Sequence, residues 1–114
     1  ASRMVREVGL FDPKYSFYYS DYDYCRRVTL SGWQIYYAPG AIVRHKVSLS
    51  TQRGPAAAHW WRNMGLAESQ FYRQYESYTQ LAIHVLWIVV RTVLQGRARY
   101  IPAYMQGLRD GFDV

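Results

Sequence analysis

Two aspartates and a histidine are the residues of this sequence whose side chains suggest chemistry. Asp21 and Asp23 lie where we expect a helix to begin, and His45 lies near the end of an expected strand. A carboxylate at a helix start is stabilised by the helix dipole and can accept a proton from a hydroxyl group, while a neutral imidazole can bind a metal. The pattern therefore suggests Asp21 as a general base and His45 as a metal ligand.

Each of these residues also has a purely structural explanation. Ser20 and Asp23 form the S-x-x-D pattern of a capping box, and Arg27 follows Asp23 at the spacing of an ion pair along a helix. We expect Ser20, Asp23 and Arg27 to order the helix. Asp21 could be no more than a favourable charge at a helix start, and His45 no more than a hydrogen-bonded strand residue.

The elements expected to position these residues give residues 1–55 an α/β character. Glycines at positions 9 and 32 mark the ends of two helices, because glycine readily adopts the left-handed conformation that closes a helix. Pro39-Gly40 marks a turn between two segments rich in aromatic and β-branched residues. The expected elements are helices over 3–8 and 20–31 and strands over 33–37 and 42–46.

Residues 56–114 show only helical patterning. We predict three helices, Ala56–Tyr78, Thr79–Gln95 and Ala98–Phe112. In the middle one, a first apolar face is made by Leu81, Val85, Ile88 and Thr92, and the apolar surface is extended by Ile83, Leu86, Trp87, Val90 and Val93. So broad a surface must be covered by the rest of a protein, by a second copy or by a membrane interface.

Composition limits the partners. The formal net charge is +6, but the cations are spread along the chain rather than gathered on one helix or tail, so we expect no nucleic-acid partner. Phosphorylated ligands or an anionic lipid surface fit the charge equally well. The apolar run 85–90 is too short to span a bilayer. The single Cys25 favours a reducing compartment, and we expect it to be buried beside Val28.

An ordered set of motifs resembles a known enzyme family. These motifs are V-G-L-F-D at 8–12, the aromatics at 17–19, D-x-D-x-C-x-R from Asp21, Gly32-Trp33, Pro39-Gly40 and His45. They are similar to the acceptor-side half of family 2 inverting glycosyltransferases of the GT-A fold. The closest similarity is to bacterial rhamnosyl- and galactofuranosyltransferase-like proteins of cell-surface polysaccharide synthesis.

The resemblance implies a fold and roles for individual residues. The fold would be the C-terminal portion of a GT-A, Rossmann-like domain (residues 1–55) followed by a helical region (56–114). Asp21 would be the general base. Tyr18, Tyr19 and Trp33 would bind the acceptor, and His45 would help hold a divalent cation, Mn²⁺ or Mg²⁺. The donor would be a nucleotide sugar and the acceptor a saccharide or a lipid-linked molecule.

The chain also departs from the family pattern. Ser20 stands where relatives carry a glutamate, so the base lacks a second neighbouring carboxylate. The chain starts with Ala1, and we expect an upstream nucleotide-sugar half to have been removed. The isolated chain is accordingly expected to be inactive and to self-associate. We expect the protein in the cytoplasm, at the inner face of the cell membrane.

The same residues leave a second interpretation open. A basic, tyrosine-rich module without catalytic activity could contact a partner or a membrane surface. Under that interpretation the acidic residues near position 21 and His45 would each be satisfied locally. Under the enzyme interpretation they would border one cleft.

Overall fold

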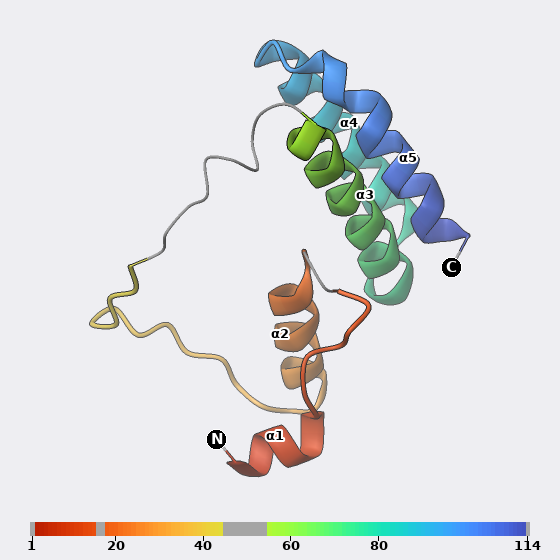
Figure 1. Ribbon diagram of the computed structural model, residues 1–114. Helices are drawn as coiled ribbons and strands as arrows, with labels where there is room; N and C mark the ends of the chain where they lie inside the picture. The colour runs from red at the N-terminus through yellow and green to blue at the C-terminus, as the bar shows by residue number, and fades with distance from the viewer. Residues whose placement is uncertain (1, 16–17, 45–54, 114) are drawn as a thin grey trace. The chain divides into compact units, whose positions relative to one another are not determined.

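The computed structural model describes residues 2–15, 18–44 and 55–113 (Figure 1). Over these ranges the chain is helical and contains no strand. It divides into two compact units, residues 1–48 and 49–114. The predicted α/β fold, a portion of a GT-A domain with a short strand pair, is therefore wrong for the described residues.

The first predicted strand, residues 33–37, is irregular. Its side chains are largely exposed, at 54% for Ile35, 79% for Tyr36 and 89% for Tyr37. Strand propensity mainly reflects packing on a half-buried sheet surface, and the described residues offer this segment no sheet to join. In the second predicted strand, residues 42–44 are also irregular, and 45–46 lie outside the described residues.

The first unit contains two helices, α1 (Ser2–Val8) and α2 (Ser20–Leu30). Gly9, with φ at 84°, follows α1, and its amide donates to the carbonyl of Val5. Gly32, with φ at 81°, follows α2, and the amide of Trp33 reaches back to the carbonyl of Val28 at 3.1 Å. Both predicted glycine stops are confirmed.

The predicted cap of α2 is wrong. The N-cap residue is Tyr19, which adopts a left-handed conformation with φ at 63° and makes no side-chain cap hydrogen bond. The carboxylate of Asp23 turns to the guanidinium of Arg27 instead of closing a capping box with Ser20. Burial explains this alternative, because a carboxylate that is shielded from water needs a charged partner, and Arg27 supplies one.

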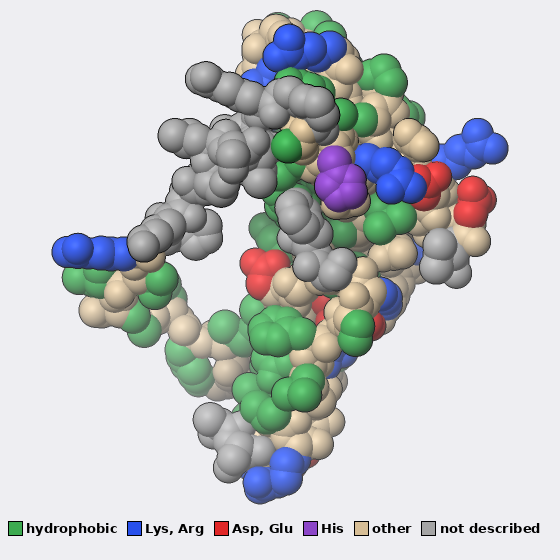
Figure 2. Space-filling model, viewed as in Figure 1, with side chains coloured by type: hydrophobic (Ala, Val, Ile, Leu, Met, Phe, Trp, Pro, Cys, Tyr) green, Lys and Arg blue, Asp and Glu red, His purple; other side chains and the backbone are tan. Residues whose placement is uncertain are grey.

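Much of the first unit's apolar surface is exposed (Figure 2). Leu10, Leu30 and Ile42 are 77%, 66% and 90% exposed. Cys25 is exposed as well, so its predicted burial is wrong. It borders an open apolar hollow of about 360 Å³ whose other lining residues include Tyr24 and Val28.

The second unit is a bundle of α3 (Pro55–Tyr75), α4 (Tyr78–Leu94) and α5 (Ile101–Phe112), with the short 3₁₀ helix η2 (Ala98–Tyr100) before α5 (Figure 1). The three predicted helices are confirmed, with ends shifted by a few residues. Leu81 and Thr92 are buried and Val85 and Ile88 half-buried, so the apolar face predicted from these four residues is the one that α4 turns into the bundle. None of the helices in the described ranges combines the length and apolarity needed to cross a bilayer.

Glycines let α3 and α5 approach backbone to backbone. A Cβ added to Gly107 would overlap the carbonyl group of Arg62 and lie 2.9 Å from the amide nitrogen of Leu66. Gly65 meets α5 and Gly111 meets α3 in the same way. Beside this contact, Leu81, Tyr104 and Leu108 form the core of the bundle.

Candidate functional site

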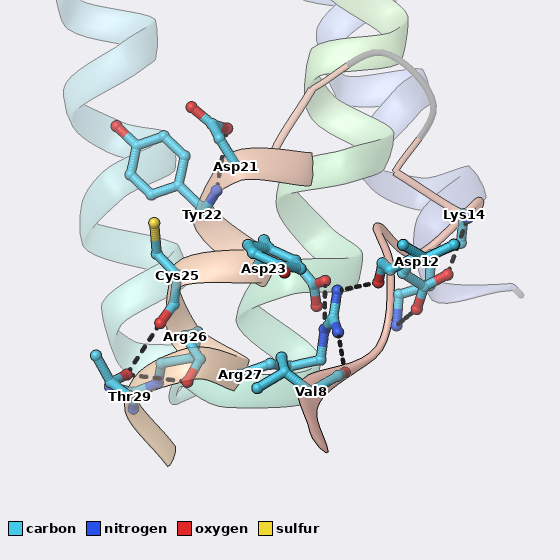
Figure 3. Close-up of polar contacts among 12 residues, drawn as sticks. Val8, Asp12, Lys14, Asp21, Tyr22, Asp23, Cys25, Arg26, Arg27 and Thr29 are labelled. Atoms are coloured by element: carbon cyan, nitrogen blue, oxygen red, sulfur yellow. Dashed lines mark hydrogen bonds and ion pairs between the residues drawn. The ribbon is translucent and has the colours of Figure 1, made fainter. Parts of the chain in front are cut away.

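A buried carboxylate and the guanidinium group of an arginine join the two helices of the first unit. Asp23 is fully buried, and its Oδ2 accepts from Nε of Arg27 at 2.9 Å. The other two nitrogens of Arg27 donate to the carbonyl oxygens of Val8 (2.7 Å) and Leu10 (2.8 Å) (Figure 3). We call these four residues the Arg27 clamp. The predicted pair of Asp23 and Arg27 is confirmed, and it fixes α2 to the end of α1.

The loop that follows α1 is held by further local contacts. Phe11 packs on Tyr24 of α2 with ring centroids 4.7 Å apart. Asp12 accepts the backbone N–H of Lys14 at 3.0 Å, and this hydrogen bond holds the pKa of the Asp12 carboxyl below its usual value. Together with the Arg27 clamp, these contacts fix the V-G-L-F-D segment beside α2.

Asp21 has the opposite environment from Asp23, although only one residue separates them. It is exposed in the first turn of α2 and lies away from the Arg27 clamp (Figure 3). Its Oδ1 accepts the backbone N–H of Tyr22 at 3.0 Å, and it forms no ion pair within the described residues. A carboxylate in this position is available to receive a proton from a bound hydroxyl group.

Tyrosines surround the start of α2. Tyr19 and Tyr22 pack with ring centroids 5.3 Å apart. Tyr18 is half-buried, and burial raises the pKa of its hydroxyl. The structure therefore places two of the predicted acceptor-binding residues, Tyr18 and Tyr19, immediately before the helix turn that carries Asp21.

Trp33, the third predicted acceptor-binding residue, is not part of this group. It follows the far end of α2, and the eleven residues of that helix span about 16 Å. Its indole N–H donates to Oε2 of Glu7 at 3.0 Å, and the guanidinium of Arg3 lies 6.0 Å from its ring centre. These contacts give Trp33 a structural role against α1.

The predicted metal ligand lies outside the described residues, since these end at 44 before the gap that contains His45. Over the ranges that the structure covers, no three or more His, Cys, Asp or Glu side chains come together as a metal-binding group.

A second group of titratable side chains, in the helical unit, was not predicted. Glu68 is 1% exposed, and its Oε2 accepts from the hydroxyl of Tyr104 at 2.9 Å. Its Oε1 lies 3.2 Å from Nε2 of His84. Burial raises the pKa of Glu68 to about 7 and lowers the pKa of His84, because it disfavours the charged form of each side chain.

A sequence signal for this cluster does exist. Trp61, Gly65, Glu68 and Tyr72 recur at helical spacing on one side of α3, so Glu68 interrupts an otherwise apolar face. A carboxylate at such a position needs a partner from a neighbouring helix. The pattern could have flagged Glu68, but it could not name His84 or Tyr104.

Comparison with known proteins found no matching family model, no matching curated protein and no matching solved structure. What the geometry offers is one exposed carboxylate beside tyrosines, held on a helix that a buried ion pair fixes in place.

Proposed function

We propose that the chain is the acceptor-side part of an inverting glycosyltransferase in which Asp21 is the general base. The observation that carries the proposal is the difference in environment between two neighbouring carboxylates. Asp23 is sealed in the Arg27 clamp, while Asp21 is exposed at the start of the same helix. The motif resemblance supports the same assignment of base and supporting residue.

In the proposed reaction, the Asp21 carboxylate takes the proton of an acceptor hydroxyl. The hydroxyl oxygen forms a bond to the anomeric carbon of a nucleotide sugar while the bond to the diphosphate breaks, with inversion at that carbon. The rings of Tyr18 and Tyr19 offer apolar faces and hydroxyl edges to a saccharide acceptor.

The Arg27 clamp takes no part in the proton transfer but fixes the position of the helix that carries the base. A general base must be held within hydrogen-bond reach of the proton that it abstracts. The clamp ties α2 to two backbone carbonyls of the preceding segment, and this limits the movement of the turn that carries Asp21. In this proposal Asp23 and Arg27 are positioning residues.

The test is an Asp21→Asn variant of the complete gene product, assayed with a panel of nucleotide-sugar donors and saccharide acceptors. The amide keeps the shape of the side chain and its hydrogen bond to Tyr22 but cannot take a proton. We expect kcat to fall by about 10²- to 10⁴-fold, which is the usual contribution of a general base. Binding of the nucleoside diphosphate and the thermal midpoint should not change.

Asp113→Asn is the matched control, because it neutralises another exposed carboxylate in the other unit. It should leave kcat unchanged. Transferase activity that survives Asp21→Asn would contradict the assignment of the base. A complete gene product without transferase activity on any donor would favour the non-catalytic binding module instead.

A further inference from the structure

The outer face of α4 is apolar and exposed. We define this face by six residues that recur at helical spacing: Ile83, Leu86, Trp87, Val90, Val93 and Leu94. They are between 49% and 82% exposed. The opposite side of α4, around Leu81 and Thr92, is buried in the bundle. A folded unit that leaves this much contiguous apolar surface on one helix has a surface suited to docking.

The charged side chains of α4 and of the segment that follows it are all basic. The sequence contains no acidic residue between Glu76 and Asp110. Arg91 lies at the edge of the face, with its guanidinium 5.0 Å from the ring centre of Trp87. An apolar helix face bordered by arginine and tryptophan is the arrangement of helices that lie in a membrane interface.

The end of α4 gathers two more arginines beside the first. Gly96, with φ at 67°, reverses the chain, and the amide of Arg97 donates to the carbonyl of Thr92 at 2.9 Å. This closure keeps Arg97 next to the last turn of α4. Arg99 follows in η2, with its guanidinium 4.9 Å from the ring centre of Tyr100. All three arginines are exposed.

We propose that the outer face of α4 docks on an anionic lipid surface, with α4 lying in the plane of the interface. The six apolar side chains enter the boundary between headgroups and acyl chains, and Arg91, Arg97 and Arg99 meet lipid phosphates. The alternative of a second copy is less favoured, because pairing two such faces brings cationic, acid-free segments together. An anionic bilayer supplies the missing negative charge.

The experiment measures binding of the full 114-residue chain to sedimented vesicles. One set contains phosphatidylglycerol and phosphatidylcholine, and the other contains phosphatidylcholine alone. We expect binding to the anionic vesicles at low salt, weaker binding at high salt because counterions screen the arginines, and little binding to the neutral vesicles.

Two groups of variants separate the charged and apolar contributions. Replacing the three arginines by glutamine should weaken binding to anionic vesicles by about 100-fold, or about fivefold for each cation. Leu86→Gln with Val90→Gln should weaken it by about tenfold or more, because less apolar area is buried. Glutamine is a good helix former, so α4 should remain folded, which circular dichroism would verify.

Leu30→Gln is the matched control, because Leu30 is 66% exposed in the first unit and far from α4 in sequence. It should leave binding unchanged. Absence of binding to anionic vesicles at low salt, or binding that neither group of variants weakens, would overturn the proposal. The proposal would also be overturned if the chain bound no vesicles but formed a dimer, and if Leu86→Gln with Val90→Gln dissociated that dimer. None of these results depends on transferase activity, so they test the lipid surface separately from the role of Asp21.

Discussion

The two units hold their helices together by different means. In the first unit, the cation of the Arg27 clamp reaches from α2 to two backbone carbonyls near the end of α1, and much of the apolar surface stays exposed. In the second unit, glycines bring α3 and α5 into direct backbone contact beside a buried core. The first arrangement depends on a charge being present, and the second depends on side-chain atoms being absent.

The way in which each unit is held together suits the function that we propose for it. A unit fixed by a few directional polar contacts can leave a neighbouring carboxylate such as Asp21 exposed to a ligand. A unit fixed by close packing is rigid and is better suited to carrying a docking surface such as the outer face of α4. Each unit should therefore lose stability when the contacts that hold its own helices together are removed.

The largest effect is expected from Gly107→Ala in the helical unit. The new Cβ would overlap the carbonyl group of Arg62, which belongs to the backbone and cannot move aside cheaply. We expect a loss of about 3 kcal/mol or more, because overpacking of this kind forces backbone shifts. This outweighs the gain of about 1 kcal/mol that alanine brings to a helix interior. Chemical denaturation followed by circular dichroism measures it.

Gly40→Ala is the control for that substitution. An added Cβ at Gly40 meets nothing within 4 Å, and the backbone there does not require glycine. Its stability should stay within about 0.5 kcal/mol of the parent chain. Equal stabilities for Gly107→Ala and Gly40→Ala would show that α3 and α5 are not in close contact.

The next effect is expected from Asp23→Asn in the first unit. Asparagine keeps the shape of the side chain but leaves the partly buried Arg27 without its counter-ion. We expect the stability of α2 to fall by about 3 kcal/mol, since Asp23 is fully buried and its substitution leaves the guanidinium, which is 23% exposed, without this carboxylate. Amide hydrogen exchange in α2 should then accelerate by about 100-fold.

Asp21→Asn is the matched comparison, because it changes the same atoms two positions earlier. Asp21 is exposed and outside the Arg27 clamp, so exchange in α2 should change little. If the two variants behave alike in hydrogen exchange, the proposed division between a structural and a catalytic aspartate is wrong.

A pH-dependent loss of stability is expected from Glu68. Its pKa in the folded chain, about 7, exceeds the ordinary value of 4.5. The folded state therefore binds this proton more tightly than the unfolded state does. The resulting stabilisation is complete below pH 4.5 and is lost as the pH rises through 7, by up to about 3 kcal/mol.

Glu68→Gln removes this titration while keeping a hydrogen-bond acceptor for Tyr104. Denaturation between pH 5 and 8 should show the parent chain losing stability relative to the variant as the pH rises. His84 contributes with the opposite sign, because its lowered pKa costs stability as the pH falls, and this contribution is present in both chains. A constant difference between the two chains would contradict a raised pKa for Glu68.

Local signals in the sequence were sufficient for the existence of the helices and for two of their ends. Gly9 and Gly32 stop helices because the left-handed conformation is cheapest for glycine, and no distant residue is needed. The four-residue spacing of Asp23 and Arg27 was sufficient for their ion pair, which forms within one helix.

Features that depend on distant partners could not be obtained in this way. Residues 33–37 have the composition of a strand, but a strand also needs a neighbour, and composition does not provide one. The reach of Arg27 to Val8 and Leu10 depends on how the chain folds back after α1. The contact of Glu68 with His84 and Tyr104 joins three helices, and spacing within one helix cannot reveal it.

The smallest effect is expected at the start of α4, where the predicted helix 56–78 ran through Ser77 and its cap was missed. Ser77 caps this helix: its hydroxyl accepts the amide of Gln80 at 3.2 Å, and its own amide donates to Oε1 of Gln80 at 2.8 Å. Ser77→Ala should cost about 1 kcal/mol, the usual value of an N-cap. Thr79→Ala, an exposed change inside the same turn, should cost nothing measurable. Because the two hydrogen bonds of this capping box join residues only three apart, their loss should lower stability without altering the buried contacts of Glu68. If the stability of the Ser77→Ala variant depended on pH differently from that of the parent chain, the start of α4 and the buried cluster would be coupled.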